Sequence, residues 1–175
     1  MNMRRATILA LLLLTGCAAG GGTTVSLTPA DPATSILTGG PLSMRVVSTP
    51  ASGDDPLNVM TLARADGRAM SFEEANHAPN DVRTQAAGGP LAQTMGLFGD
   101  EQPTLYHARQ GGSGAAFICA PDGAANLGIY TAPDGKVTVV GLKSGFEFET
   151  RPDGTVEALP YSPDHICARM HFTKG

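Results

Sequence analysis

Residues 126–142, NLGIYTAPDGKVTVVGL, contain two β-rich runs, NLGIYT and KVTVVGL, on either side of Pro133-Asp134-Gly135. Proline presets φ at the first corner of a turn, aspartate bonds back to the backbone, and glycine takes the left-handed position. The flanking runs are rich in branched and aromatic residues, which favour strands. The stretch therefore predicts two antiparallel strands joined by a tight turn.

The same turn motif recurs along the C-terminal part of the chain. Pro-Asp-Gly also occurs at 121–123 and 152–154, and Ala65-Asp66-Gly67 is a weaker copy. Short β-rich runs lie between the turns, at 115–119, 126–131, 136–142, 146–150, 155–159 and 165–172. Six such strands predict an antiparallel meander. We therefore expect a mainly β fold, with α+β as the alternative, whose C-terminal half is a curled meander or a small barrel.

The composition supports a core and many turns. Apolar residues make up 42% of the 175, there is no Trp, and the chain has 22 Gly and 13 Pro. The core must therefore be built largely from aliphatic side chains. Two further strands are expected at 42–48 and 57–63, separated by a loop.

The middle of the chain predicts short helices. Ser71 and Glu74 have the spacing of a capping box, and Pro79 would end the helix that they begin. Further short helices are expected at 81–87, before Gly88-Gly89, and at 91–97, before Gly99. The alternative is that most of this middle segment is loop.

The first residues, MNMRRATILALLLLTGC, have the order of an export signal. Arg4 and Arg5 precede an apolar run at 6–14, which is too short to span a hydrocarbon layer of about 30 Å. Leu14-Thr15-Gly16-Cys17 resembles the lipobox of bacterial lipoproteins. The resemblance implies cleavage after Gly16, diacylglycerol on the Cys17 sulfur, and a membrane anchor without a transmembrane helix.

The resemblance divides the chain into three parts. Residues 1–16 would be the signal peptide, 17–41 the lipidated Cys17 with a flexible tether, and 42–175 a single globular domain. Ala18 in place of Asp implies sorting to the outer membrane, facing the periplasm, with the inner membrane or the cell surface as alternatives. Loss of the leader changes the net charge from −4 to −6. No basic cluster remains, so nucleic-acid binding is not expected.

The two cysteines that remain, Cys119 and Cys167, would lie in an oxidising compartment, where an even pair most simply forms a disulfide. The alternatives are two free buried thiols or a reactive or metal-binding pair. A disulfide here would stabilise the fold by roughly 4 kcal/mol. It would also require the first and last strands of the meander to approach each other, and therefore a strongly curled sheet.

The stretch 162–172, SPDHICARMHF, places a cysteine between two histidines. On a strand, His165 and His171 lie about 20 Å apart, whereas two ligands of one zinc ion must lie within about 4 Å of each other. Cys167 would be consumed by the disulfide. We therefore expect an ordinary strand with Ile166, Ala168, Met170 and Phe172 on its core face, and no metal site.

Other candidate sites are also weak. Residues 111–115, GGSGA, depart from a nucleophile elbow and precede a strand. Glu73 and His77 have a spacing that can bind metal on a helix, but no second histidine lies nearby. The Asp-Gly turns lack the stacked acidic positions of a calcium loop. No catalytic residue, metal or cofactor is expected.

Three functions are compatible with these features. The first is a non-enzymatic, lipid-anchored binding or accessory module with an envelope protein partner. The second is a periplasmic inhibitor of a hydrolase such as a lysozyme or protease. The third is a small hydrolase. A protruding loop beside an apolar patch would favour partner binding.

Overall fold

The computed structural model describes residues 22–49, 57–75, 87–98, 101–109, 116–143, 148–159 and 162–175. The elements, in chain order, are β1 Thr23–Pro29, α1 Pro32–Thr38, β2 Leu42–Thr49, β3 Leu57–Arg64, β4 Ala69–Glu74, η1 Ala87–Leu91, α3 Ala92–Met95, β5 Thr104–Ala108, β6 Asn126–Thr131, β7 Lys136–Leu142, β8 Phe148–Thr150, β9 Val156–Ala158, η2 Pro163–His165 and β10 Ile166–Lys174.

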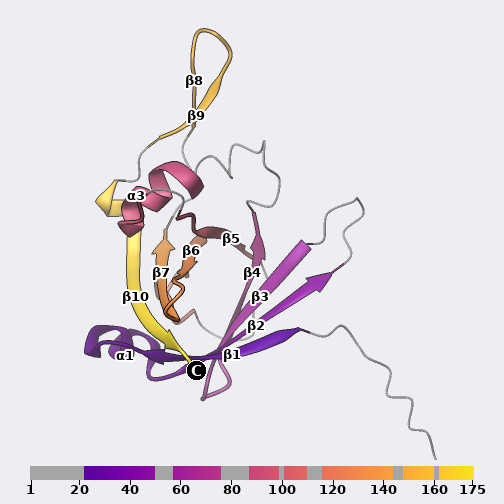
Figure 1. The fold of residues 1–175 in the computed structure, drawn as a ribbon, viewed down its shortest axis with the longest axis vertical. Coiled ribbons are helices and arrows are strands. Elements are labelled where there is room, and N and C mark those ends of the chain that lie inside the picture. Colours follow the sequence, from indigo (N-terminus) through magenta and orange to yellow (C-terminus); the bar gives the residue numbers. More distant parts are fainter. Residues whose placement is uncertain are drawn as a thin grey trace, which may run out of the picture.

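Eight of the described strands form a closed barrel in the order β1-β10-β7-β6-β5-β4-β3-β2 (Figure 1). Neighbouring strands are antiparallel, and each strand from β1 to β6 pairs with the next one along the chain. β10 pairs with both β7 and β1 and so closes the ring. The expected mainly β fold with a small barrel is confirmed, and the barrel takes in both halves of the chain.

Alternate side chains of each strand fill the barrel interior. In β10, Ala168, Met170 and Phe172 are buried while Arg169 and His171 are exposed, as the sequence predicts. Each large apolar side chain buried in this way contributes about 1.5–3 kcal/mol. The fully buried members of this core include Leu27, Leu42, Met60, Leu62, Phe72, Leu127, Met170 and Phe172.

The predicted flexible tether at 17–41 is wrong from residue 22 onward. Residues 23–29 form β1, which pairs with β2 along its length and with β10 through its last three residues. Residues 32–38 form α1, in which the Asp31 carboxylate accepts a hydrogen bond from the Thr34 N–H at 2.8 Å. This bond to its charged form lowers the pKa of Asp31. The globular domain therefore begins before residue 42, because the barrel cannot close without β1.

The helix predicted to begin at Ser71 is also wrong. Residues 69–74 form β4, which pairs with β3 and β5 and turns Phe72 into the core. A strand presents alternate residues to one face, so Met70 and Phe72 face the core while Ser71 and Glu73 lie on the other face. Glu73 therefore lies on a strand, and His77 lies outside the described residues.

Short helices do cover one outer face of the barrel. The helix expected at 91–97 is observed in part: η1 leads directly into α3, which covers only Ala92–Met95. The helix ends there because Gly96 adopts the left-handed conformation, with φ 73°. Leu91 and Met95 pack against Leu105, Val140 and Leu142, which point outward from the barrel wall. The predicted helix at 81–87 lies outside the described residues, apart from its last position.

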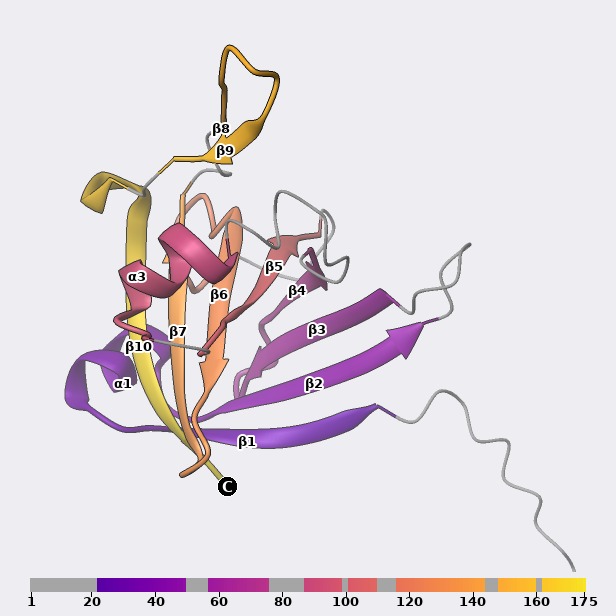
Figure 2. The same ribbon diagram turned by 45° about the horizontal axis from the view of Figure 1, so that its top comes forward.

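The C-terminal strands agree with prediction in part. β6 and β7 match the expected bounds 126–131 and 136–142, and Gly135 has the expected left-handed φ of 84°. The predicted strand at 115–119 is wrong, because residues 117–119 form bends and residue 116 belongs to no strand. β8 and β9 fall within two predicted strands, but they form a separate two-stranded hairpin that projects from the barrel (Figure 2).

Within the described ranges, the helices are all too short or too polar to cross a membrane.

Candidate functional site at the disulfide end of the barrel

β3, β5 and β7 end at one end of the barrel, where β4, β6 and β10 begin. We call this the disulfide end, and it comprises the turn 64–68, the loop 116–125 and Cys167. The loop closes this end because Phe117, Ile118 and Ala124 are buried in the barrel core. The site is therefore built from segments far apart in the sequence.

The predicted disulfide joins Cys119 to Cys167, with their Cα atoms 5.3 Å apart. Cys167 lies at a register shift between β10 and β7, which turns its sulfur toward the loop. Cys119 has φ 58°, a left-handed conformation that costs a residue with a side chain of the order of 1–2 kcal/mol. Strained backbone of this kind persists only where its surroundings hold it, and it is frequent at functional sites.

Arg64 also lies at the disulfide end, where β3 leads into the turn 64–68. Its guanidinium carbon lies 5.7 Å from the centre of the Phe117 ring, and its Nε lies 3.4 Å from the Asp66 carboxylate. Gly39 makes room for the guanidinium group, because a Cβ atom there would lie 2.0 Å from an Arg64 nitrogen. The C-terminal end of α1 therefore lies close against Arg64.

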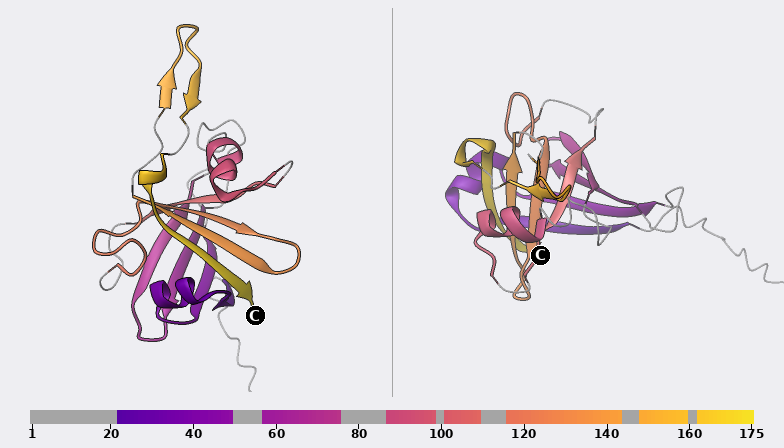
Figure 3. Two further views of the ribbon diagram at one scale, coloured as in Figure 1. Left: turned by 90° about the vertical axis from the view of Figure 1, so that its left-hand side faces the viewer. Right: turned by 90° about the horizontal axis from the view of Figure 1, so that it is seen from above.

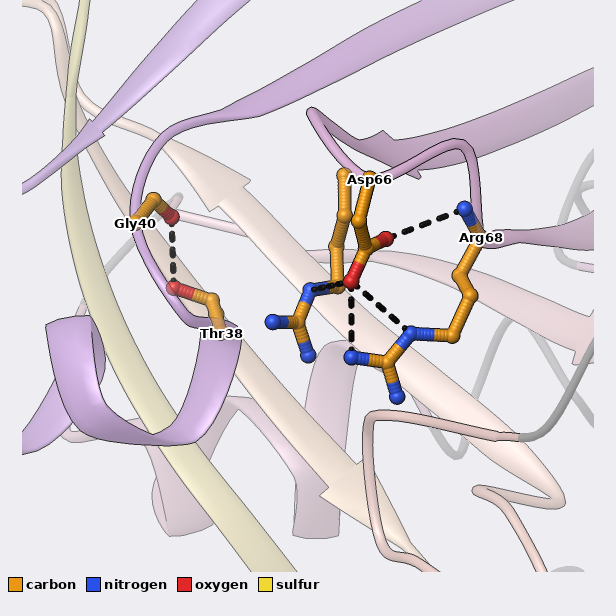
Figure 4. Close-up of polar contacts among 5 residues, drawn as sticks. Thr38, Gly40, Asp66 and Arg68 are labelled. Atoms are coloured by element: carbon orange, nitrogen blue, oxygen red, sulfur yellow. Dashed lines mark hydrogen bonds and ion pairs between the residues drawn. The ribbon is translucent and has the colours of Figure 1, made fainter.

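Asp66 also accepts hydrogen bonds from the backbone and side chain of Arg68, as Figure 4 shows. These bonds, with the charges of Arg64 and Arg68, lower the pKa of Asp66. In the same view, the Thr38 hydroxyl donates to the Gly40 carbonyl at 2.7 Å and fixes the chain that leaves α1. Two cations share one carboxylate, so this corner carries a net positive charge.

Two hollows of about 360 Å³ each flank the loop 119–123. The first lies between the loop and β4, with Met70 and Phe72 among its apolar lining and Ser71 and Arg109 among its polar lining. The second lies beside the disulfide and is lined by Lys143 and Ile166. Asp122 lines both hollows, so each has one basic and one acidic residue on its wall. They suit short polar segments of a partner better than a large apolar ligand.

The β8–β9 hairpin projects at the same end, because it connects the end of β7 to the start of β10 (Figure 3). Its loop is closed by hydrogen bonds within residues 151–155. The Asp153 carboxylate accepts hydrogen bonds from the Thr155 hydroxyl at 2.6 Å and from the Thr155 N–H at 2.9 Å, and these bonds lower the pKa of Asp153. Gly154 has φ 83°. Arg151 and Glu157 form an ion pair across the strands. All residues from 149 to 157 are exposed.

A polar row lies inside the opposite end of the barrel, where β1 begins. The Ser48 hydroxyl bonds to Asn58, and the Asn58 amide donates to the Glu74 carboxylate. Burial raises the pKa of Tyr106, on the neighbouring strand, to about 12, and the negative charge of Glu74 adds to this effect. The row places polar groups over the apolar core at this end.

The structure leaves the sequence-predicted histidines apart. His165 lies in η2 and His171 in the exposed face of β10. In the described part of the chain, no group of three or more His, Cys, Asp or Glu side chains could hold a metal. Cys17 and the stretch 111–115 lie outside the described residues.

Sequence reasoning missed a pair on the outer wall. The His107 Nδ1 and the Oδ1 of buried Asn126 share a hydrogen bond between β5 and β6. These residues lie 19 positions apart, and only the strand register brings them together. Such a bond orients an imidazole as in catalytic arrangements, but a nucleophile is also needed. The described contacts of His107 include no serine or cysteine.

No protein-family model, curated protein or solved structure matches the chain.

Proposed function

We propose that the protein is a lipid-anchored lipoprotein of the bacterial envelope, and that it acts as a non-enzymatic module binding another envelope protein through its disulfide end. The observation that supports this most strongly is the placement of β1 and the hairpin. β1 begins at one end of the barrel, and β8–β9 leaves the other (Figure 1). An anchor at Cys17 would thus hold the end of the barrel where β1 begins near the membrane. The disulfide end, with the hairpin, would then be accessible to a partner protein.

The hairpin has the features of a binding element. Its backbone is fixed by the Asp153–Thr155 bonds before any partner arrives, which reduces the entropy lost on binding. Its exposed side chains include Glu149, Arg151, Asp153 and Glu157, so it would present mainly negative charge. A two-stranded hairpin that does not pack against a core is only marginally stable by itself. Its projection is therefore better explained by contact with a partner.

The anchor is proposed from the lipobox and placed at the outer membrane, facing the periplasm, because residue 18 is Ala. Replacing Cys17 by Ala should move the protein from the detergent phase to the aqueous phase in a phase-partition assay. Density-gradient separation of the membranes then distinguishes the outer from the inner membrane. Retention of the Cys17→Ala variant in the detergent phase would refute the anchor.

The partner is best sought by site-specific photocrosslinking in whole cells. A photoreactive residue at Thr150, in the hairpin, should give a discrete adduct, whereas the same residue at exposed Thr173, at the C-terminal end of β10, should not. Replacing residues 148–158 with Gly-Ser-Gly should abolish binding of the partner. The partner should then be absent when the variant is purified from cells. Equal adducts at Thr150 and Thr173 would show that the hairpin is not the contact.

Inhibition of a hydrolase is the second candidate function, and the rigid Pro152-Asp153-Gly154 loop is the observation that favours it. A preformed projecting loop is what a protein inhibitor inserts into an active-site cleft. The purified domain should then inhibit lysozyme or a periplasmic protease with a stoichiometry of about one, and the hairpin replacement should abolish inhibition. Full enzyme activity at saturating domain would exclude those enzymes as targets.

A further inference from the structure

The corrected start of the barrel leaves a very short connection to the proposed anchor. Only residues 18–21 separate Cys17 from Gly22, the first described residue. At no more than about 3.6 Å per residue, the connection from Cys17 to Gly22 spans at most roughly 18 Å. A tether reaching residue 41 would average about 25–30 Å. The connection is therefore too short to hold the barrel away from the membrane surface.

We infer that the barrel rests directly on the phospholipid surface with the end where β1 begins, and that Arg45 contacts lipid phosphate groups there. This inference rests on the proposed lipidation of Cys17. It goes beyond the anchor itself, because it assigns a second contact with the membrane and a fixed orientation of the domain.

Arg45 is placed at the point where the anchor enters the barrel. β1 pairs with β2 so that Thr24 lies opposite Arg45 and Thr23 opposite Val46. The Arg45 Nε would lie 3.1 Å from a Cβ atom at Gly22, so the side chain lies against the first described residue. Guanidinium groups bind phosphate oxygens through paired N–H donors, which suits this group for a lipid headgroup.

The charge around Arg45 agrees with this placement. β1 and β2 carry no other charged residue, and their exposed polar side chains at this end include Thr23, Thr24 and Ser48. The Glu74 carboxylate, on β4, is bonded to Asn58 within the barrel mouth. Asp54 and Asp55, in the connection after β2, lie outside the described residues.

The orientation can be measured on the full lipidated protein in phosphatidylethanolamine and phosphatidylglycerol vesicles that contain quencher-labelled headgroups. A fluorophore is attached to a single cysteine introduced as Thr24→Cys or as Thr150→Cys, with the native disulfide left oxidised. The label at position 24 should be quenched, and the label at 150, on the hairpin, should not. Equal quenching at the two positions overturns the inference while leaving the anchor intact.

Two variants make the test specific. One basic side chain at an anionic surface is worth about 1 kcal/mol, so Arg45→Ala should lower the population of the quenched orientation about fivefold. Arg45→Lys should retain most of the quenching, and Lys143→Ala, which removes a charge at the disulfide end, should retain all of it. Full quenching in Arg45→Ala would exclude the phosphate contact.

Lengthening the connection separates the two proposals. Twenty Gly/Ser residues inserted before Gly22 would give a coil of about 27 Å on average, which should weaken quenching at position 24 without releasing the protein. Flotation with vesicles is recorded for every variant. Failure of the wild type to float, or flotation of Cys17→Ala, would refute the anchor, an outcome that differs from equal quenching of a floating protein.

Discussion

The sulfur of Cys119 occupies the space that a side chain at position 141 would fill: a Cβ atom at Gly141 would lie 2.8 Å from it. The Cβ would also meet Ile118 and Ala168 at 3.2 and 3.3 Å, and the sulfur cannot retreat because it is bonded to Cys167. Gly141→Ala should therefore destabilise the protein by about 1–3 kcal/mol, the usual cost of overpacking a core.

Urea denaturation measures this loss. Gly89→Ala is the matched control, because a Cβ atom there meets nothing within 4 Å and its φ is ordinary. The control should remain within about 0.5 kcal/mol of the wild type. A Gly141→Ala variant as stable as Gly89→Ala would show that the loop moves away freely.

Removing the disulfide should lower the free energy of unfolding considerably more than Gly141→Ala does. Cys119 and Cys167 are 48 residues apart, and a loop of this length closed by a disulfide restricts the unfolded chain by roughly 4 kcal/mol. The double variant Cys119→Ala/Cys167→Ala should lose about this amount in urea denaturation. An unchanged midpoint would mean that loop packing through Phe117 and Ile118 alone holds this end.

The left-handed backbone at position 119 allows a finer test in the same background. With Cys167→Ala, Cys119→Gly should be more stable than Cys119→Ala by about 1 kcal/mol, because glycine adopts φ 58° without steric cost. This order is the reverse of the usual one, since glycine ordinarily loses more chain entropy than alanine. An alanine variant that is the more stable would show that the loop relaxes once the disulfide is gone.

Tyr106 makes stability depend on alkaline pH. Burial raises its pKa from 10.0 to about 12, so the unfolded chain releases the phenol proton at a lower pH than the folded one. The associated stability, on the order of 2–3 kcal/mol, is present below pH 10 and lost as pH rises toward 12. Tyr106→Phe should lose less stability than the wild type over this interval. Equal slopes in the two proteins would contradict the assignment.

Thr34 is a buried contact between α1 and the barrel. Its side-chain oxygen accepts a hydrogen bond from the His171 N–H at 2.9 Å, and the residue is fully buried. Thr34→Val keeps the shape but leaves that N–H without its acceptor, at a cost of about 1–3 kcal/mol. Thr34→Ser should restore much of the loss, and Thr28→Val, at an exposed position in β1, should have little effect. Thermal unfolding measures the three variants, and Thr34→Val should have the lowest unfolding temperature.

Turn chemistry explains which strands could be predicted. The bounds of β6 and β7 follow from the branched residues on either side of Pro133-Asp134-Gly135, where the Asp134 carboxylate accepts from the Lys136 N–H. These signals are local and need no partner strand. β1 lacks them, because Thr, Ser and Pro dominate it and only Val25 and Leu27 turn inward. Its strand character comes from pairing with β2 and β10.

One reason for which the sequence predicts a curled sheet is not supported by the structure. A disulfide between the first and last strands of a meander requires these strands to approach each other. In fact Cys119 lies in a loop over β7, and Cys167 lies on β10, which pairs directly with β7. The disulfide therefore joins neighbours and needs no closure. β1, the predicted tether, closes the barrel instead.

The candidate site was largely beyond sequence reasoning. The disulfide pair could be predicted from the number of cysteines together with an N-terminal segment that resembles an export signal. The two hollows could not, because their walls come from β4, the end of β5, the loop 116–125 and β10, which only the strand register brings together. The same holds for Arg64 and Phe117, which lie 5.7 Å apart between a turn and a distant loop.

The pairing of β1 with β10 also sets when the protein can fold. Leu27 lies opposite Lys174, so the ring cannot close until the last strand has been synthesised. A chain synthesised from its N-terminus therefore holds its first strand without β10 for nearly the whole of its synthesis. The disulfide can also form only at the end of synthesis, because Cys167 lies on β10.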